Sequence, residues 1–409
     1  MRAKLGDVTE NLDYKRVPIA QKDRADLEKL YPYYGAQGIV DYVDDYIFDG
    51  EYLLVAEDGE NLRSRKNSIV TFAKGKFWVN NHAHILGEKA GTNLTYIYYL
   101  LKGLDLSGYI TGSAQPKLTQ ENLSRLEIDI PDVQCQRDVA TLLSTIDAKI
   151  DNNNAIAAEL EGMAKDLYDY WFVQFDFPDE NGKPYKSSGG KMVWNEELKR
   201  EIPEGWEVDK LGKHITSSRG ISYNSATLEG DGVPMINLAS FGVDSNYKPA
   251  GIKTYNGQYD ADKILHPFDL IMCNTQQTAI DPTKDIIGKA MLVPDIFDGD
   301  VVSSHHVTTI TPDVDELKYY LYGTCKTTWF HKYIVGFASG TNILGLDFKG
   351  FEDYLMPLPP MRLLKKFATA IKNIESEKNL IITKNAELAS LRDFLLPMLM
   401  NGQVKVKGA

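Results

Sequence analysis

The sequence predicts an α+β protein built as an internal duplication, with two β-rich mixed globular units and two long helices. Three observations lead to this class. Two segments far apart in the chain share one register, a long helical pattern follows each of them, and short β-rich runs separated by turn signals fill the rest. We expect the two helices to form an antiparallel coiled coil, which would make the molecule pseudo-twofold.

The repeat is clearest where residues 112–131 (GSAQPKLTQENLSRLEIDIP) are compared with residues 340–359 (GTNILGLDFKGFEDYLMPLP). Both segments begin with glycine and end with proline, and equivalent positions differ by 228 in number without a gap. The same offset continues into the helices that follow. Residues 4–6 (KLG) also recur as residues 210–212. A similar frame with dissimilar contents is what a scaffold carrying two different specificities would show.

Two amphipathic helices follow the repeated segments, and their apolar residues alternate steps of four and three, the heptad pattern of a coiled coil. A helix of about 40 residues is about 60 Å long, which we expect to exceed the surface of one globular unit. A surface helix packed on its own domain is the alternative. Pro397 and Gly402 are expected to end the second helix. The expected seam consists of Val139, Leu143, Ile146, Ile150, Leu160 and Leu167 in the first helix and Phe367, Ile371, Ile374, Ile381, Leu388 and Leu395 in the second.

Polar residues interrupt the seam at Asn153 in the first helix and at Lys378, Asn385 and Arg392 in the second. Buried polar residues in a seam fix the register of a coiled coil at some cost in stability. We therefore expect these four positions to set how the helices align.

The duplication also sets the expected domain boundaries. Residues 1–131 and 205–360 are the globular units, and residues 132–175 and 361–409 hold the helices, the latter with a tail. Residues 176–204 are polar and rich in glycine, proline and serine in their first half, so they are predicted to be an exposed linker.

Composition restricts the class of protein. Hydrophobic residues make up 43% and charged residues 25% of the 409 residues, as in soluble globular proteins. No apolar run approaches the ~20 residues of a membrane helix, and residues 1–16 lack the apolar segment of a signal peptide. We therefore expect a cytoplasmic protein that does not associate with membranes. The three cysteines lie far apart, which argues against disulfides or a cysteine zinc site.

The sequence contains no recognised catalytic or cofactor motif. It has no P-loop, no GxGxxG after a strand, no GxSxG and no HExxH. Residues 281–283 (DPT) lack the second proline and the aromatic residue of an amino-methyltransferase signature. The histidines within 82–84 and 305–306 lack the further ligands that zinc requires. We therefore expect no catalytic residue, metal or cofactor in this chain.

Polar and basic loops after predicted strands are candidate DNA contacts. The net charge of -12 argues against a broad basic surface but leaves room for local patches. Lysine and arginine hold phosphates, asparagine and glutamine read adenine, and arginine reads guanine. A solvated loop is the alternative for each residue. The candidates are Arg63, Arg65, Lys66, Gln115 and Lys117 in the first unit and Arg219, Asn274, Gln276, Gln277 and Lys284 in the second.

Together these features resemble the specificity subunits of type I restriction-modification systems, over essentially the whole chain. The resemblance lies in residues 112–131, in the helix end at 167–194 (LYDYWFVQFDFPDENGKPYKSSGGKMVW), in residues 202–212 (IPEGWEVDKLG) and in residues 387–404 (ELASLRDFLLPMLMNGQV). No single segment would suffice, and the combination is specific.

The resemblance implies a non-catalytic subunit whose globular units are target-recognition domains, each reading one half of a bipartite DNA site. The helices would set the spacing and dock two modification (methyltransferase) subunits. S-adenosylmethionine, ATP and Mg would belong to the modification and restriction subunits. Residues 340–346 (GTNILGL) lack Gln115 and Lys117, so a DNA role of that pair need not apply to the second unit. A coiled-coil scaffold whose globular units bind protein, and a stand-alone enzyme, remain alternatives.

Overall fold

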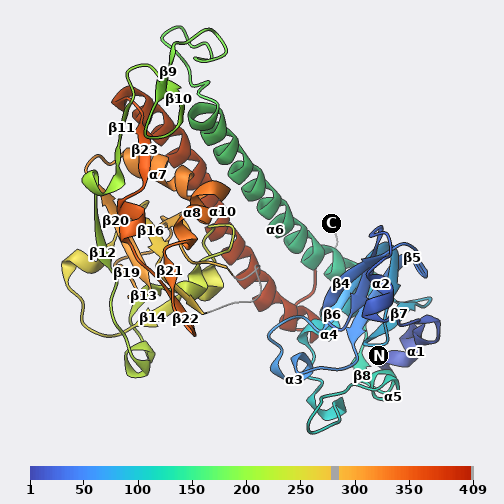
Figure 1. Ribbon diagram of the computed structural model, residues 1–409. Coiled ribbons are helices and arrows are strands. Elements are labelled where there is room, and N and C mark those ends of the chain that lie inside the picture. Colours follow the sequence, from blue (N-terminus) through green and yellow to red (C-terminus); the bar gives the residue numbers. More distant parts are fainter. Residues whose placement is uncertain (278–284, 407–409) are drawn as a thin grey trace. The chain divides into compact units, whose positions relative to one another are not determined.

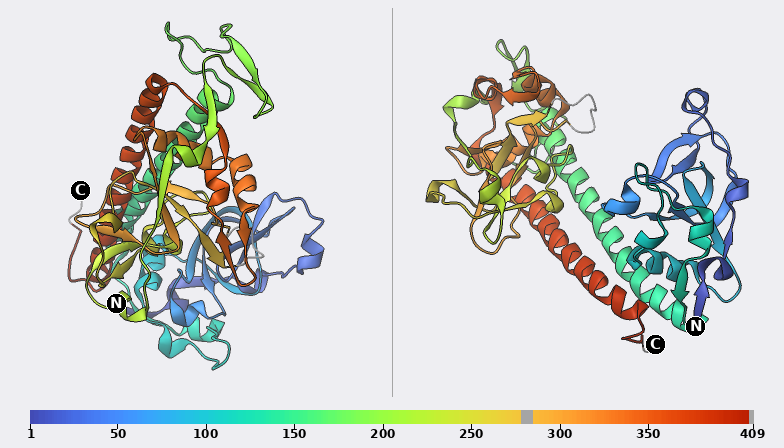
Figure 2. Two further views of the ribbon diagram at one scale, coloured as in Figure 1. Left: turned by 60° about the vertical axis from the view of Figure 1, so that its left-hand side comes forward. Right: turned by 90° about the horizontal axis from the view of Figure 1, so that it is seen from below.

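The computed structural model describes residues 1–277 and 285–406 (Figure 1). The chain divides into two compact units, the first made of Met1–Asn152 and Ala386–Ala409 and the second of Asn153–Asn385. Both units combine sheets with helices, which confirms the mixed class predicted from the sequence. The division falls within both long helices, which continue through it without a break (Figure 2). Each unit therefore contains one globular part and a section of each long helix.

A six-stranded sheet with the order β2-β7-β5-β6-β3-β4 forms the centre of the first unit. Strand β5 is central because it pairs antiparallel with both β6 and β7, and its last four residues are buried. Helix α4 packs against this sheet through a shared hydrophobic core. The elements are β1 (Arg2–Lys4), α1 (Leu5–Val8), β2 (Thr9–Asn11), α2 (Gln21–Arg24), β3 (Tyr31–Gly35), β4 (Gly38–Val43), β5 (Phe48–Ala56), α3 (Asn61–Ser64), β6 (Val70–Val79), β7 (Ala83–Glu88), α4 (Leu94–Gly103), α5 (Gln120–Ser124) and β8 (Glu127–Asp129).

The second unit contains two four-stranded sheets, β12-β20-β16-β18 and β14-β13-β19-β15, and a three-stranded sheet, β17-β22-β21. Strand β16 is the counterpart of β5, since it pairs antiparallel with β18 and β20 and is wholly buried. The elements are β12 (Ile215–Arg219), β13 (Val233–Ile236), β14 (Lys253–Tyr255), β15 (Ile264–Leu265), β16 (Leu270–Cys273), β17 (Thr275–Gln277), β18 (Ala290–Leu292), β19 (Val301–Ser303), β20 (Val307–Pro312), α7 (Leu317–Cys325), α8 (Thr328–Val335), β21 (Ala338–Ser339), β22 (Ile343–Leu346) and α9 (Lys349–Glu352).

The two globular parts repeat a close backbone approach beside a pair of short antiparallel strands. Strand β1 pairs with β8, and β11 (Glu207–Lys210) pairs with β23 (Leu355–Leu358). A Cβ atom added at Gly6 would lie 3.0 Å from Cβ of Ser124, and one at Gly212 would lie 3.0 Å from Cβ of Glu352. Glycine is needed at both places because any side chain would crowd the facing helical turn.

A tight turn is also built twice. Gly112 and Gly340 have φ angles of +83° and +138°, and an added Cβ would lie 2.2 Å and 2.0 Å from the carbonyl oxygens of Gln115 and Ile343, respectively. Both the left-handed backbone and the lack of space exclude other residues. These turns support the internal duplication, because the facing residues also differ by 228 in number.

The two predicted long helices are present as α6 (Val133–Tyr168) and α10 (Met361–Met400). A π-helical turn, Asp169–Val173, extends α6. Helix α10 does not end at Pro397, as we expected, but three residues later. Pro397 lies in the last turn, where the loss of one backbone hydrogen bond is tolerated more easily than in the middle of a helix. Gly402, with a φ angle of +67°, follows the helix end.

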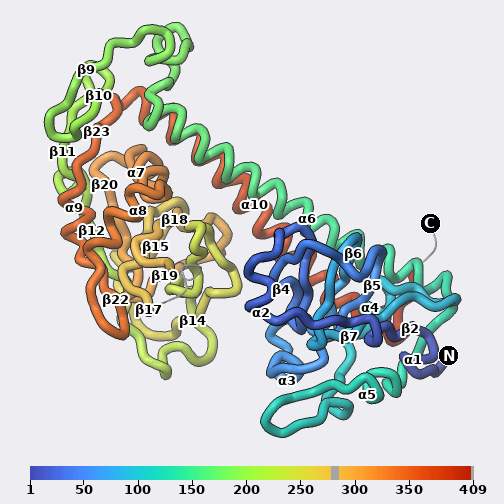
Figure 3. Tube along the Cα trace, turned by 45° about the vertical axis from the view of Figure 1, so that its right-hand side comes forward, coloured from blue at the N-terminus to red at the C-terminus, as the bar shows by residue number. Residues whose placement is uncertain are grey.

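Within the second unit, α6 and α10 lie antiparallel (Figure 3). The Asn153 amide donates to Oδ1 of Asn385 at 2.8 Å, and Nζ of Lys378 donates to Glu161 at 2.7 Å. As the residue number rises along α6, the facing residue number falls along α10. The polar interruptions at Asn153, Lys378 and Asn385 are therefore paired across the two helices.

Within the first unit, the predicted seam position Arg392 pairs with Asp147 of α6 at 2.8 Å. Asp147 also accepts a hydrogen bond of 2.6 Å from the hydroxyl of Tyr99 in α4. The second unit repeats this contact, since Tyr322 of α7 donates to Glu375 of α10 at 3.2 Å. In both units a tyrosine of the globular part is thus joined to a carboxylate of a long helix.

The seam residues near each helix start pack into the adjacent globular core, where we had expected the helices to bury their seams on each other. Val139 and Leu143 belong to the core of the first unit, and Phe367 and Ile371 to that of the second. None of the predicted seam residues is exposed. Buried are Val139, Leu143, Ile146, Phe367, Ile371 and Ile381, and half-buried are Ile150, Leu160, Leu167, Ile374, Leu388 and Leu395.

The segment predicted as a linker, residues 176–204, is largely exposed but folded. Strands β9 (Met192–Asn195) and β10 (Arg200–Pro203) form an antiparallel hairpin within it. Phe177 stacks on Trp206 with ring centroids 5.4 Å apart. Composition predicted the exposure, but the aromatic residues hold the segment against the second unit's core. Among the described residues, no helix combines the length and hydrophobicity needed to cross a membrane.

Leu143→Ala is expected to lower the free energy of unfolding by about 2–5 kcal/mol, because Leu143 is fully buried and its truncation leaves a cavity. Leu391→Ala, on the same unit's section of α10, is the matched control, since Leu391 is 47% exposed; it should change stability by less than ~0.5 kcal/mol. Denaturant unfolding measures both. Equal effects of the two variants would contradict this core assignment.

Candidate nucleic-acid interface

Loops at the carboxyl end of β5 form one continuous surface of the first unit. The chain leaves β5 at Glu57, and the returning loop is tied to it, because the Leu118 N–H donates to the Glu57 carbonyl at 2.8 Å. The Gly59 N–H donates to the carbonyl of Pro116 at 3.1 Å. Residues 57–63 and 111–118 are therefore held side by side.

Three predicted DNA contacts meet on this surface. The Arg63 guanidinium donates to the carbonyls of Gly112 and Ser113, at 3.0 Å to the latter. Nζ of Lys117 lies 3.1 Å from Glu57. Arg63, Gln115 and Lys117 are all exposed. The structure thus brings together residues that are more than 50 positions apart in the sequence.

Arg65 and Lys66 lie elsewhere, in a shallow hollow that they line with Lys102 and Asp105. Arg65 adopts a left-handed backbone conformation, with a φ angle of 50°, and donates to the carbonyl of Leu104 at 2.8 Å. Burial lowers the pKa of Arg65, although the charge of Asp105 opposes this. Arg65 therefore holds the end of α4, while Lys66 is exposed to solvent.

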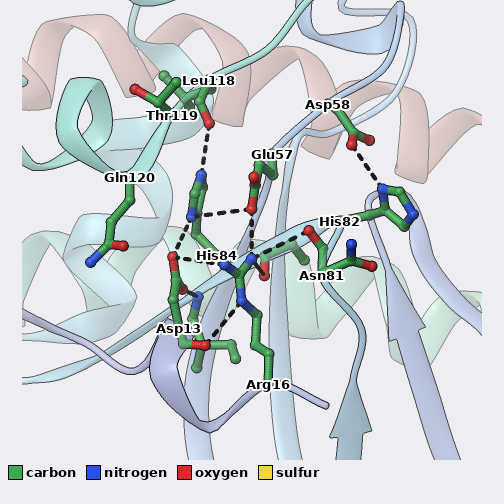
Figure 4. Close-up of polar contacts among 12 residues, drawn as sticks. Asp13, Arg16, Glu57, Asp58, Asn81, His82, His84, Leu118, Thr119 and Gln120 are labelled. Atoms are coloured by element: carbon green, nitrogen blue, oxygen red, sulfur yellow. Dashed lines mark hydrogen bonds and ion pairs between the residues drawn. The ribbon is translucent and has the colours of Figure 1, made fainter. Parts of the chain in front are cut away.

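A network of charged residues supports the surface from beneath (Figure 4). His84 is buried, with Nδ1 at 2.6 Å from Asp13 and Nε2 at 2.7 Å from the Leu118 carbonyl. Since a carbonyl only accepts, Nε2 carries the hydrogen. Arg16 donates to Glu57 at 2.6 Å and lies 3.4 Å from Asp13. Cations and carboxylates alternate in this network.

The network holds its two carboxyl groups in the ionised form. Burial raises the pKa of Asp13, but the hydrogen bond and charge of His84 outweigh it and leave the pKa below the ordinary value of 3.8. Burial likewise raises the pKa of Glu57, and its bonds to Arg16 and Lys117 more than offset this, so that pKa is also lowered. The loops therefore rest on a cluster in which each buried carboxylate is paired with a nitrogen-bearing side chain.

Asp13, Glu57 and His84 form a group whose ligand atoms lie within 4.8 Å of one another, close enough to hold a metal ion. Both ring nitrogens of His84 are already engaged, and Arg16 bridges the two carboxylates. A divalent cation would have to displace a guanidinium from this site. The residues therefore fit an ion-pair network better than a metal centre.

The second unit has a counterpart of this loop junction with uncharged residues. The Leu346 N–H donates to the carbonyl of Asn274 at 2.8 Å, as Leu118 does to Glu57. The Asn274 side chain donates to Thr308 at 2.8 Å and is 2% exposed. The same junction is built around carboxylates in one unit and around an amide and a hydroxyl in the other.

Two predicted base readers are buried. Nδ2 of Asn274 donates to the carbonyl of His305 and to the hydroxyl of Thr308, and Oε1 of Gln276 accepts the N–H groups of Ile286 and Ile287, both at 2.7 Å. Gln276 is only 6% exposed. In this structure neither side chain is an exposed loop residue, and their role in reading a base stays a prediction.

Arg219 and Gln277 are exposed at this end of the second unit. Arg219 ends β12 and pairs with Thr308 of β20, and Gln277 ends β17. Lys284 lies outside the described residues. Arg219 and Gln277 thus remain candidate contacts.

From the sequence, His82 and His306 are considered only as metal ligands, whereas the structure places both imidazoles at these junctions. Nδ1 of His82 lies 2.7 Å from Asp58, and Nδ1 of His306 lies 2.7 Å from Thr275. Residues 79–86 (VNNHAHIL) and 302–310 (VSSHHVTTI) are similar in sequence and indicate one repeated strand. The strand pairing was needed to show which histidines are equivalent.

Comparison with known proteins finds one family whose model matches the first part of the chain. Residues 1–162 match the family described as "Type I restriction modification DNA specificity domain". A solved S subunit of a type I restriction-modification system from M. genitalium has a similar fold, with a TM-score of 0.60, 15% identity and coverage of 100% of this chain and 96% of that one.

Two curated relatives match over most of their length. The type I restriction enzyme MjaIX specificity subunit of Methanocaldococcus jannaschii is 26% identical over 83% of this chain and 75% of its own. A putative type I restriction enzyme specificity subunit of Haemophilus influenzae, S.HindORF215P, is 24% identical over 94% of this chain and 90% of its own. The chain is therefore similar over most of its length to type I restriction enzyme specificity subunits.

His84→Ala is expected to destabilise the protein by roughly 3–5 kcal/mol, because it leaves the buried Asp13 carboxylate without its main partner. His266→Ala removes an exposed imidazole and serves as the control. In the wild type, Asp13 and Glu57 have lowered pKa values, so their contribution is present above the ordinary carboxyl range and is lost as the pH falls through it. Unfolding curves from pH 7 to pH 3 should show a weaker acid dependence for Asp13→Asn than for the wild type; parallel curves would contradict the network.

Proposed function

We propose that this chain is the DNA-specificity subunit of a type I restriction-modification complex, with each globular part reading one half of a bipartite site. The observation that carries the proposal is that the two units share one backbone framework at their loop junctions but place different side chains on it. The loop junctions are held by the same backbone hydrogen bond, yet Glu57 and Asn274 occupy the same place. Alike frames keep the geometry of reading constant, and unlike side chains read different bases.

Strand pairing supports the equivalence of the residues at the two junctions. In the first unit β5 and β7 pair Val55 with His84, and in the second β16 and β20 pair Met272 with Thr308. Val55 lies two residues before Glu57, and Met272 lies two residues before Asn274. A cluster of an imidazole and carboxylates in the first unit therefore corresponds to an uncharged threonine–asparagine contact in the second.

The long helices would set the distance between the half-sites. The residue numbers of Asn153 and Asn385, of Glu161 and Lys378, and of Asp147 and Arg392 add to 538 or 539 in each pair. This constant total is what one antiparallel coiled coil requires. Combined with the 228-residue offset, it would place a pseudo-twofold axis near residues 155–156 and 383–384.

The same helices offer a surface for the modification subunits. Ile156 and Met163 are exposed on α6, and Tyr170, seven residues further, is exposed on the π-helical turn that extends it; Leu391, the equivalent of Met163, is exposed on α10. Residues seven apart lie on one face of a helix. Such a face suits two copies of one partner, in keeping with the two equivalent helices.

The proposal assigns no catalysis to this chain. S-adenosylmethionine, ATP and Mg would be bound by the modification and restriction subunits. The net charge of -12 fits this division, since the partners would supply much of the positive surface that holds DNA phosphates.

Replacing residues 1–131 with the corresponding unit of the Methanocaldococcus jannaschii relative should change one half-site and leave the other unchanged. The complex with its methyltransferase is used to methylate genomic DNA, and the modified sites are sequenced. The reciprocal exchange of residues 205–360 is the matched control and should change only the other half-site. A change of both half-sites by either exchange would contradict the proposed division of labour.

Insertion of one heptad into each helix, after residues 155 and 383, should lengthen the unread spacer. Seven residues add about 10 Å of helix, which is about three base pairs of DNA. The half-sites should not change, because the globular parts are untouched. The same seven residues inserted in the exposed turn at 180–183 should leave the spacer as it is. An unchanged spacer in the double-helix variant would refute the role of the helices as a ruler.

A further inference from the structure

A histidine occupies the same place in both units, at the turn that leads into the strand beside the junction. His82 precedes β7, and its Nδ1 lies 2.7 Å from Oδ2 of Asp58 (Figure 4). His306 precedes β20, and its Nδ1 lies 2.7 Å from Oγ1 of Thr275. In each unit the partner is the second residue after the central buried strand ends, at the loop junction.

The strand registers show that the two histidines are equivalent. Leu53 of β5 pairs with Leu86 of β7, and Leu270 of β16 pairs with Ile310 of β20. His82 lies four residues before Leu86, and His306 lies four residues before Ile310. Asp58 lies five residues after Leu53, and Thr275 lies five residues after Leu270. One hydrogen bond is thus conserved between the copies, although one of its two partners has changed.

The hydrogen bond leaves the outer nitrogen of each ring available. The His82 side chain is 49% exposed, and His306 is half-buried. Among residues 1–277 and 285–406, Nε2 of neither histidine has a hydrogen-bond partner that accounts for it. Each ring is held in orientation by Nδ1 while Nε2 stays free for a ligand.

The two partners prepare different chemistry at Nε2. The Asp58 carboxylate accepts, so Nδ1 of His82 carries the hydrogen, and in the neutral form of the ring Nε2 would be an acceptor, suited to the exocyclic amino group of adenine or cytosine. The Thr275 hydroxyl can also donate, which allows His306 to present Nε2–H as a donor to O6 or N7 of guanine. Burial and the nearby charge of His305 and Lys253 lower the pKa of His306, which favours its neutral form.

The surroundings of both histidines suit a nucleic acid. Asp58, the partner of His82, forms an isolated β-bridge with Lys117, and Arg63 donates to the carbonyl of Ser113 in the same exposed loop. Beside His306 lies Tyr223, with ring centroids 6.4 Å apart, and Lys253 lies over the Tyr223 ring. Cations for phosphate and polar groups for base edges are therefore gathered around each imidazole.

We propose that His82 and His306 are specificity-determining residues, one for each half-site, which contact base edges through Nε2 and are oriented by the positioning residues Asp58 and Thr275. This inference rests on the proposed function. The partner at Nδ1 sets whether Nε2 accepts or donates. The difference between Asp58 in one unit and Thr275 in the other would therefore change the base that is read without moving the ring.

The test uses the complex with its methyltransferase and the sequence motif of methylated sites. His82→Ala should relax one base pair in one half-site, with a roughly 5- to 150-fold loss of discrimination there, and His306→Ala should do so in the other. Asp58→Ala and Thr275→Ala should relax the same base pairs as the corresponding histidine variants. A merely structural role would lower the methylation rate without changing the motif.

His266→Ala is the matched control, because His266 is an exposed imidazole 3.6 Å from Asp269 and away from the junction, and its motif should stay that of the wild type. His82→Gln and His306→Gln, checked by thermal melting, replace any alanine variant that fails to fold. Unchanged motifs in both histidine variants would overturn the inference while leaving the proposed function intact. Failure of the wild-type complex to show a bipartite motif would instead overturn the proposed function.

Discussion

The hydrogen bond between a tyrosine of each globular part and a carboxylate of a long helix is the contact on which the arrangement depends. Tyr99 donates to Asp147 in the first unit, and Tyr322 donates to Glu375 in the second. Burial raises the pKa of both phenols, so each stays protonated and remains a donor. Asp147 also accepts from Arg392, so one carboxylate in the first unit holds both the globular part and the second helix. This shared carboxylate adds to the packing of Val139 and Leu143 in the same core and fixes the globular part on the helices of the first unit.

Much of the frame could be predicted from the sequence, because its signals are local. The heptad steps predicted both long helices, and the glycine at the start of each repeated segment marked a turn that only glycine can form. The end of α10 was predicted too early, because Pro397 is compatible with a last helical turn. Local patterns fix local structure, and the tertiary setting decides how far it extends.

The site was less predictable, because it depends on contacts between distant residues. Asn274 and Gln276 look like base readers in the sequence, but both side chains are buried, and Nδ2 of Asn274 bonds Thr308 while Oε1 of Gln276 bonds the backbone N–H groups of residues 286–287. The partnership of Asp13 with His84 spans 71 positions and joins the helical turn after β2 to β7. Arg63, Gln115 and Lys117 were identified correctly as exposed loop residues, since charge and turn composition suffice for that. Their role in binding DNA stays a prediction.

The division of the chain also bears on the order in which it folds during synthesis. The core of the first unit includes Leu399, so a residue from the far end of the chain completes the packing of residues made first. At about 5–20 residues per second, translation of the intervening chain takes tens of seconds or less. During that time Val139 and Leu143 have their globular neighbours but lack the section of α10 that closes the unit. The nascent first unit therefore waits, partly uncovered, until the last helix leaves the ribosome.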